Sequence, residues 1–236
     1  MWRSRKAFKV SRSKLKNTDP AFAKGSKKSS KHFMHKGEKL NSITHLVGLG
    51  LSLIGAIAII LKSDFSGNLA KLVSNALFGI TVIALYAAST GFHVTRGSVK
   101  ALWAKADHSG IYLLIAGTYT PLSILQYEGP MDGLLIALVW GAAVFGIFKE
   151  IRASHRNQPP LMLYLLLGWV SVAAVIPIVR NIPGHGLLWL LVGGGLYTLG
   201  VPFYVNSTRW RHAHGIWHLF VLAGTCAHYY TIYSYI

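Results

Sequence analysis

The sequence predicts an all-α integral membrane protein with seven transmembrane helices, and three observations support this fold class. Hydrophobic residues make up 52% of the 236 residues and charged residues only 13%, a balance typical of membrane proteins. The apolar residues gather in seven runs, each long enough to cross roughly 30 Å of hydrocarbon. Lysine and arginine are concentrated in alternate connections between these runs, which indicates an odd number of spans.

The seven predicted spans follow one another closely along the chain. They lie near residues 43 to 62, 72 to 95, 107 to 126, 131 to 148, 161 to 180, 185 to 205 and 214 to 234. Only a short turn at Gly129-Pro130 separates the third span from the fourth, and three glycines at 193 to 195 interrupt the sixth. Pro177 and Pro202 predict kinks in the fifth and sixth spans, and such kinks can open cavities between helices.

The placement of basic residues predicts the orientation. Of the 24 lysines and arginines, 21 lie on one side of the predicted bilayer, in the amino-terminal segment and the connections 96 to 106, 149 to 160 and 206 to 213. The other side carries Lys62, Lys71 and Arg180. Because cytoplasmic loops hold the excess of positive charge, we expect the amino terminus to be cytoplasmic and the carboxyl terminus extracellular. The outer connections at 127 to 130 and 181 to 184 are short, which argues against a large extracellular ligand.

The chain is predicted to divide into a tail and a membrane domain. Its net charge of +17 would suit nucleic acid, but 13 of the 24 basic residues lie before residue 40. Residues 1–37 are therefore expected to form a disordered, basic cytoplasmic tail that contacts the anionic lipid surface, with RNA contact as the alternative. Residues 38–236 form the predicted seven-helix membrane domain. The tail lacks the continuous apolar segment of a cleaved signal peptide.

The cysteine content excludes an intrachain disulfide. Cys226 is the only cysteine and lies inside the last apolar run. No histidine or second cysteine stands near it at metal-ligand spacing. We therefore expect a small residue of the apolar core.

Four ionisable residues lie where predicted spans reach the cytoplasmic side. They are His93 in the second span, Asp107 at the start of the third, and His214 and His218 at the start of the seventh. Such groups are costly inside membrane spans and are usually functional. His214 and His218 are four residues apart, so both imidazoles can bind one ion. Three histidines with a carboxylate-held water match an open, catalytic zinc site; the alternative is a polar cluster that ties the helices together.

Further polar residues are expected near this site. Ser89 shares a helix face with His93, one turn deeper. Glu38, Asn41 and His45 lie at offsets of three and seven residues, so they share a helix face on the cytoplasmic side. They are candidates for groups that orient the ligands. The alternative is the polar entry of an amphipathic helix.

Two histidines and two glycines have less specific patterns. His108 points about 100° away from Asp107 on a helix and is expected at the membrane interface. His228 should face the bundle, as a hydrogen-bonded core histidine or in the wall of a cavity. Gly110 and Gly117 lie on nearly the same stripe as Asp107, where small residues let neighbouring helices approach.

These motifs together resemble the bacterial hemolysin III proteins, part of the progestin and adiponectin receptor superfamily. The resemblance covers essentially everything after residue 37. It is carried by Glu38-x-x-Asn41-Ser42-Ile-Thr-His45, Ser89-x-x-x-His93, the segment from Asp107 to Pro121, Gly168-Trp169 and His214-Gly-Ile-Trp-His218. It implies seven helices with the amino terminus inside, and a zinc ion near the inner leaflet. The ligands carry over to His93, His214 and His218, with Asp107 holding the zinc through water and Ser89 close by.

The resemblance leaves two classes of function open. A distant relationship to alkaline ceramidases implies a zinc-dependent hydrolase of lipid amides or esters in the cell membrane, with Asp107 as general base and Ser89 near the oxyanion. The hemolysin name implies instead a non-enzymatic, membrane-permeabilising protein (cytolysis), and a small-ligand sensor with a structural zinc is a third class. Other first-row metals also accept histidine and carboxylate. The sequence indicates neither the substrate nor the oligomeric state.

Overall fold

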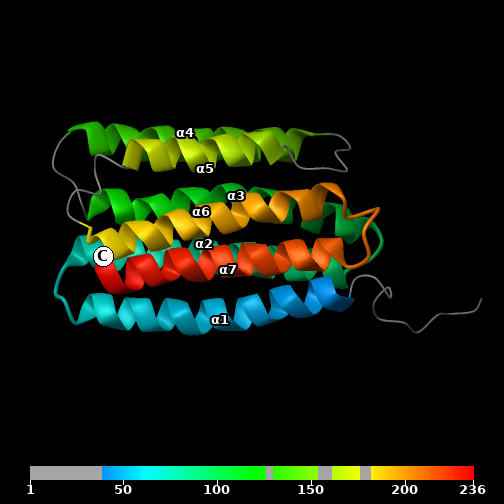
Figure 1. Ribbon diagram of the computed structural model, residues 1–236, viewed down its shortest axis with the longest axis horizontal. Helices are drawn as coiled ribbons and strands as arrows, with labels where there is room; N and C mark the ends of the chain where they lie inside the picture. The colour runs from blue at the N-terminus through cyan, green and yellow to red at the C-terminus, as the bar shows by residue number, and fades with distance from the viewer. Residues whose placement is uncertain (1–38, 126–129, 154–160, 176–181) are drawn as a thin grey trace, which may run out of the picture. The chain divides into compact units, whose positions relative to one another are not determined.

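The computed structural model describes residues 39–125, 130–153, 161–175 and 182–236, and all regular structure within them is α-helical. The helices are α1 (Lys39–Asp64), α2 (Leu69–Val94), α3 (Ser98–Ile124), α4 (Pro130–Arg152), α5 (Leu161–Val175), α6 (Gly184–Val205) and α7 (Ala213–Tyr235). Consecutive helices run in opposite directions, so α1 begins at one end of the helical unit and α7 finishes at the other (Figure 1). The prediction of an all-helical chain is confirmed.

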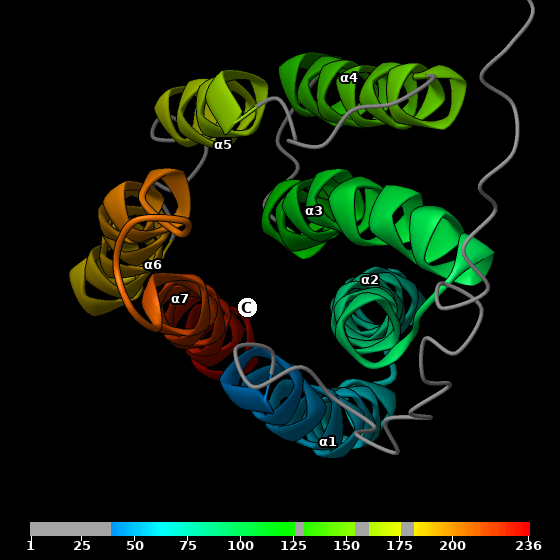
Figure 2. The same cartoon turned by 90° about the vertical axis from the view of Figure 1, so that its right-hand side faces the viewer.

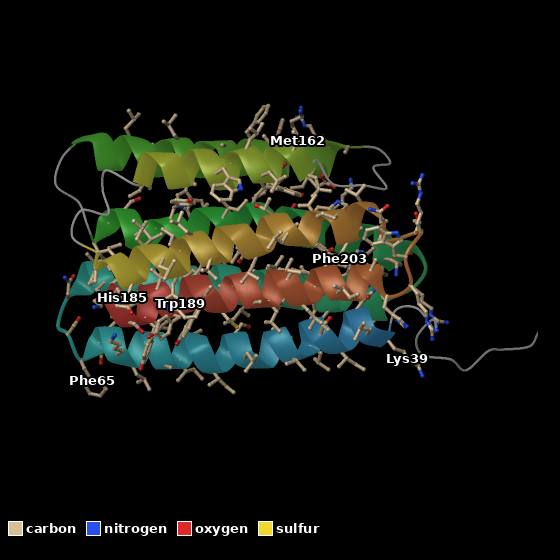
Figure 3. The ribbon with its side chains drawn as sticks, in the orientation of Figure 1. Lys39, Phe65, Met162, His185, Trp189 and Phe203 are labelled. Carbon is tan, nitrogen blue, oxygen red and sulfur yellow. The ribbon has the colours of Figure 1, made fainter. Side chains whose placement is uncertain are left out.

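Four of the described helices, α1, α2, α4 and α6, are long and apolar enough to cross a membrane. Large apolar side chains cover the outer surfaces of the described helices. Met162 is 71% exposed and Ile54 68%, and Figure 3 marks Met162 and Trp189 among the side chains of α5 and α6. Because water would disfavour so much exposed apolar surface, these faces are suited to membrane lipid.

The third helix begins earlier than the sequence predicted. We expected a connection over residues 96 to 106, but α3 starts at Ser98, which places Asp107 in the third turn instead of at the helix start. Residues 99 to 106 contain alanine, leucine and lysine, which favour helices, and no glycine or proline. Gly97, with a φ of 71°, supplies the break before the helix.

The sixth helix is continuous through Gly193-Gly194-Gly195 and through Pro202, so the three glycines do not interrupt it. At Gly193 the missing side chain leaves room for the His228 ring, because a Cβ there would lie only 2.2 Å from it. Pro177 lies outside the described residues.

In the end-on view, α2 lies between α1 and α3, and α7 lies between α1 and α6 (Figure 2). α2 packs against α1 and α3, α7 packs against α6 and α1, and α4 packs mainly against α3. The largest fully buried side chains are Phe78, Tyr86 and Tyr112. Pairing of α1 and α7 brings the first and last helices together, and with them the segments that carry Asn41 and His218.

Cys226 does not lie in the core, as the sequence predicted, but is exposed. It lines a groove between α1 and α7 together with Leu51, Gly55 and Tyr229. A small apolar residue can face outward here because lipid is as apolar as a protein core.

Two lysines on the predicted outer side hold the end of α7. The Lys62 ammonium donates to the Tyr233 carbonyl and the Lys71 ammonium to the Ile236 carbonyl. Cations stabilise the carboxyl end of a helix, where backbone carbonyls have no helical partner. This contact explains basic residues on the side that is otherwise poor in them.

Glycines on α3 permit the close approach to α2, as predicted. A Cβ at Gly110 would lie 3.0 Å from the Leu85 Cα, and one at Gly117 would lie 2.8 Å from the Thr81 Cβ. A Cβ atom essentially never lies within 3.0 Å of a carbon from a different part of the chain. A larger residue at Gly117 must therefore push α3 away from α2.

We therefore expect Gly117→Ala to destabilise the protein by about 1–3 kcal/mol, the usual cost of overpacking. Gly141→Ala on α4 is the matched control, because nothing lies within 4 Å of a Cβ there. Thermal melting in detergent, followed by helical circular dichroism, measures both. Equal melting temperatures for the two variants would contradict the close packing of α2 and α3.

Candidate metal centre

Three histidines from two helices come together at one end of the bundle. His93 lies in the last turn of α2, and His214 and His218 lie in the first two turns of α7. One ring nitrogen from each lies within 4.8 Å of the other two. The ring centroids are separated by 5.3 Å between His93 and His214, 4.9 Å between His93 and His218, and 4.7 Å between His214 and His218.

Two imidazoles of this three-histidine group, those of His93 and His218, have unpaired buried nitrogens of the kind that a metal requires. His93 and His218 are 3% and 0% exposed, and no hydrogen-bond partner meets either nitrogen of His93 or Nε2 of His218. Leaving buried polar atoms without a partner is costly. A first-row metal ion would satisfy one nitrogen of each ring, and zinc accepts histidine nitrogen readily. The residues present therefore fit zinc.

The first helix sets the orientation of His218. Its Nδ1 lies 3.3 Å from the backbone carbonyl oxygen of Asn41 and 3.3 Å from the Thr44 hydroxyl oxygen. A carbonyl only accepts, so Nδ1 carries the proton and Nε2 keeps the lone pair for a metal. Such a bond from the second nitrogen is typical of histidine ligands. Asn41 thus supports the group through its backbone.

His45 contacts the group through its ring. Its imidazole stacks on that of His218, with centroids 3.6 Å apart, and meets Tyr86 edge-on at 5.2 Å. His45 is 2% exposed and neither ring nitrogen has a hydrogen-bond partner. It therefore packs against a candidate ligand instead of bonding to it. Glu38, the third residue of that predicted set, lies outside the described residues.

Asp107 and Ser89 lie beside each other, and Ser89 is one helical turn before the candidate ligand His93. Ser89 is close enough to act electrostatically on the Asp107 carboxyl, although its hydroxyl forms no hydrogen bond of normal geometry. Ser89 is 1% exposed, whereas Asp107 is half-buried and lines a cavity. A carboxylate and an unengaged hydroxyl thus stand together at the edge of an internal space.

The sequence did not indicate the residues that hold the Asp107 turn in place. His108 Nδ1 lies 2.8 Å from Oε1 of Glu150, which is 3% exposed. The Tyr164 hydroxyl donates to the His108 carbonyl at 2.9 Å, and Lys105 donates to the Ile151 carbonyl at 2.6 Å. His108, expected at the membrane interface, is instead bonded to a buried carboxylate. The available signal was an acidic residue directly after the fourth apolar run.

An internal cavity extends from this site between α3, α5, α6 and α7. It contains about 990 Å³ of atom-free space, including the part that is open at its mouth. His45 and Asp107 line one part of it, and mostly apolar residues such as Leu114 and Val221 line the walls. His228 also lines the cavity, which was one of the two expectations for this residue.

Comparison with known proteins gives consistent relatives. The family described as "Haemolysin-III related" matches residues 33–229. The chain is 36% identical over 203 residues to "Hemolysin-3" of Bacillus cereus, covering 85% of this chain and 92% of the relative. It is 36% identical over 205 residues to "Hemolysin-3 homolog" of Bacillus subtilis (strain 168), covering 86% and 96%. It is 29% identical over 203 residues to the human "Monocyte to macrophage differentiation factor", covering 83% of each.

Proposed function

This chain belongs to the haemolysin-III-related family and is a multi-pass protein of the cell membrane, and from this premise we propose that it is a zinc-dependent hydrolase of lipid amides or esters. One observation carries the proposal. Three histidine side chains converge, with unpaired nitrogens on His93 and His218, and His45, which stacks on His218, lines a mostly apolar cavity together with Asp107. A polar reacting group and a long apolar chain could occupy these two parts together.

The protein side chains have distinct roles in this proposal. His93, His214 and His218 would hold zinc, which when bound supplies a Lewis acid and lowers the pKa of water. Asp107 would accept a proton from the attacking water, as a general base within reach of the reacting group. The buried Ser89 hydroxyl would donate to the developing oxyanion. The apolar walls would hold the acyl chain and exclude water.

A lipid screen tests the enzymatic proposal. Purified, zinc-loaded protein is expected to hydrolyse at least one member of a panel of ceramides, acyl amides and acyl esters, and His218→Ala should abolish that turnover. No turnover in the wild type, or equal turnover in the wild type and His218→Ala, would remove the support for an enzyme.

The names of the two bacterial relatives favour a second candidate, a membrane-permeabilising protein in which zinc ties α2 and α7 together. The mostly apolar lining of the internal cavity gives this candidate less support, since a water-filled pathway requires polar walls. Leakage of dye from liposomes containing the purified protein would favour permeabilisation. A small-ligand sensor would show neither leakage nor turnover.

The proposal includes seven spans, with the amino terminus cytoplasmic and the carboxyl terminus extracellular. The alternating direction of α1 to α7 and the basic residues at the end that carries the three-histidine group support this orientation.

Cysteine labelling tests the orientation. In a Cys226→Ser background, Ser66→Cys should react with a membrane-impermeant maleimide on intact cells, whereas Thr208→Cys should react only after lysis. Both residues are exposed, in connections at opposite ends of the bundle. The reverse pattern would invert the topology, and labelling of both on intact cells would contradict an odd number of spans between them.

Residues 1–37 are proposed to bind the anionic lipid surface, because 12 of the 13 basic residues before residue 40 belong to them. A peptide of these residues should bind vesicles that contain phosphatidylserine and dissociate as salt is raised. Binding to neutral vesicles of equal strength would contradict an electrostatic contact.

A further inference from the structure

The internal cavity has a second polar position, far from the three-histidine group. His228 lies on α7, ten residues after His218, which places it roughly 15 Å further along the helix. Its side chain is 9% exposed and lines the cavity. α6 and α7 lie side by side here (Figure 2). A polar group at this depth would meet the middle of a long chain whose head lies at the histidines.

The protonation of His228 follows from its hydrogen bond. Nε2 lies 3.1 Å from the carbonyl oxygen of Leu190. Because a carbonyl can only accept, Nε2 carries the proton, and Nδ1 of the neutral ring is a lone-pair acceptor. Nδ1 is not among the buried side-chain atoms that lack a partner, and no described group bonds to it, so it borders the open space of the cavity.

Gly193 makes room for this arrangement. A Cβ at that position would lie 2.2 Å from the Cδ2 atom of His228 and 3.1 Å from the Gly224 carbonyl oxygen. Only glycine therefore lets the imidazole lie against the α6 backbone, where it reaches the Leu190 carbonyl. The local sequence thus holds the ring in one orientation.

Tyr197 provides a second acceptor beside the ring. Its ring centroid lies 5.4 Å from that of His228, and its hydroxyl lies 3.0 Å from the Thr225 Oγ1. Thr225 donates its only proton to the Val221 carbonyl, so Tyr197 must donate to Thr225. The Tyr86 hydroxyl donates to the same Thr225 oxygen from the other side. The Tyr197 oxygen keeps its lone pairs free to accept.

Three other hydroxyl groups among the described residues that line the cavity already donate to backbone carbonyls. Thr118 donates to the Leu114 carbonyl, Thr198 to the Gly194 carbonyl, and Tyr119 to the Gly168 carbonyl. His228 and Tyr197, which both line the cavity, therefore offer acceptors, and a ligand hydroxyl can donate its one proton to either of them. An aliphatic chain without a hydroxyl would leave both acceptors without a partner, which is costly in a dry, apolar site.

We propose that His228 and Tyr197 form a binding position for a hydroxyl group in the middle of the acyl chain, and so make the cavity selective for hydroxylated lipids. This inference rests on the proposed lipid function and concerns recognition, not turnover. The preferred ligand would carry a hydrogen-bond donor on an otherwise apolar chain.

Two amides that differ only in the mid-chain hydroxyl test the proposal. Full-length, zinc-loaded protein is mixed with ricinoleoyl ethanolamide and oleoyl ethanolamide in competition, and native mass spectrometry counts the bound lipids. We expect a preference of roughly tenfold for the hydroxylated amide. Equal binding of the two amides, or binding of neither, would overturn the proposal.

Substitutions that keep the shape of the side chain test which residues cause the preference for the hydroxylated amide. His228→Phe and Tyr197→Phe should each reduce the ratio toward one. Two controls should keep it: Thr118→Val removes a hydroxyl that lines the same cavity, and Tyr86→Phe removes the other hydroxyl bonded to Thr225. A preference that survives both His228→Phe and Tyr197→Phe would also overturn the proposal.

The same spectra separate this proposal from the enzymatic one, because hydrolysis replaces the bound amide by the lighter acid. Hydrolysis of both amides with equal binding would reject the hydroxyl position and leave the enzyme. A hydroxyl preference without hydrolysis of any lipid would keep the binding position and reject the hydrolase.

Discussion

Purified protein is expected to contain about one zinc ion per chain, and His93→Ala, His214→Ala and His218→Ala are each expected to lose it. Each side chain supplies one nitrogen to the three-histidine group. Loss of a residue that only supports a ligand typically weakens metal binding roughly 10–100-fold, and loss of a ligand should cost more. Elemental analysis of detergent-purified protein, with helical circular dichroism as the check of folding, measures the effect.

His185→Ala is the matched control for these variants. His185 is exposed, at the start of α6, and Figure 3 shows it at the opposite end of the bundle from Lys39. It should retain the zinc. Two results would contradict the metal site: unchanged zinc content in folded His93→Ala and His218→Ala, or a wild type free of metal after chelator-free purification. The three histidines would then form a polar cluster that ties α2 and α7 together.

Asp107→Asn is expected to reduce hydrolysis by roughly 100–10,000-fold, the usual contribution of a general base, while the protein remains folded and retains zinc. The amide keeps the size of the carboxylate and removes its ability to accept a proton. Asp107 is not among the three histidines that would hold the ion, so activity and metal content should separate. Turnover of the best lipid from the screen and zinc per chain are measured on the same sample.

The competing role of Asp107 gives a different result. If the site only ties helices together, Asp107→Asn should lower zinc content or melting temperature, with no activity to lose. Ser123→Ala serves as the control, because Ser123 is a fully buried serine near the other end of α3. Unchanged hydrolysis in Asp107→Asn would exclude Asp107 as the base.

Much of the fold and part of the site could be predicted from local sequence. A long apolar run predicts a lipid-facing helix whatever segments pack against it, because hydrocarbon penalises every exposed charge and every unpaired backbone group. The spacing of His214 and His218 puts both on one face of any helix. Gly110 and Gly117 predicted a close helix contact because a missing side chain has the same effect whatever the partner.

Other features depended on which faces of distant helices meet. The start of α3 at Ser98 placed Asp107 well inside a helix, which hydropathy alone did not indicate since residues 98 to 106 are not strongly apolar. The ring contact between His45 and His218 requires α1 to lie beside α7. The exposure of Cys226 depends on which face of α7 its neighbouring helices cover.

The sequence by itself determined the helical class, the approximate helices, the family and the candidate ligands, because each of these depends on the polarity and spacing of residues within one segment. Only the tertiary structure decided that Glu150 pairs with His108, that the Asn41 carbonyl orients His218, and that His228 and Tyr197 line one cavity. These contacts join residues far apart in the chain, so their free energy depends on how helices are rotated and packed against one another, which no single helix specifies.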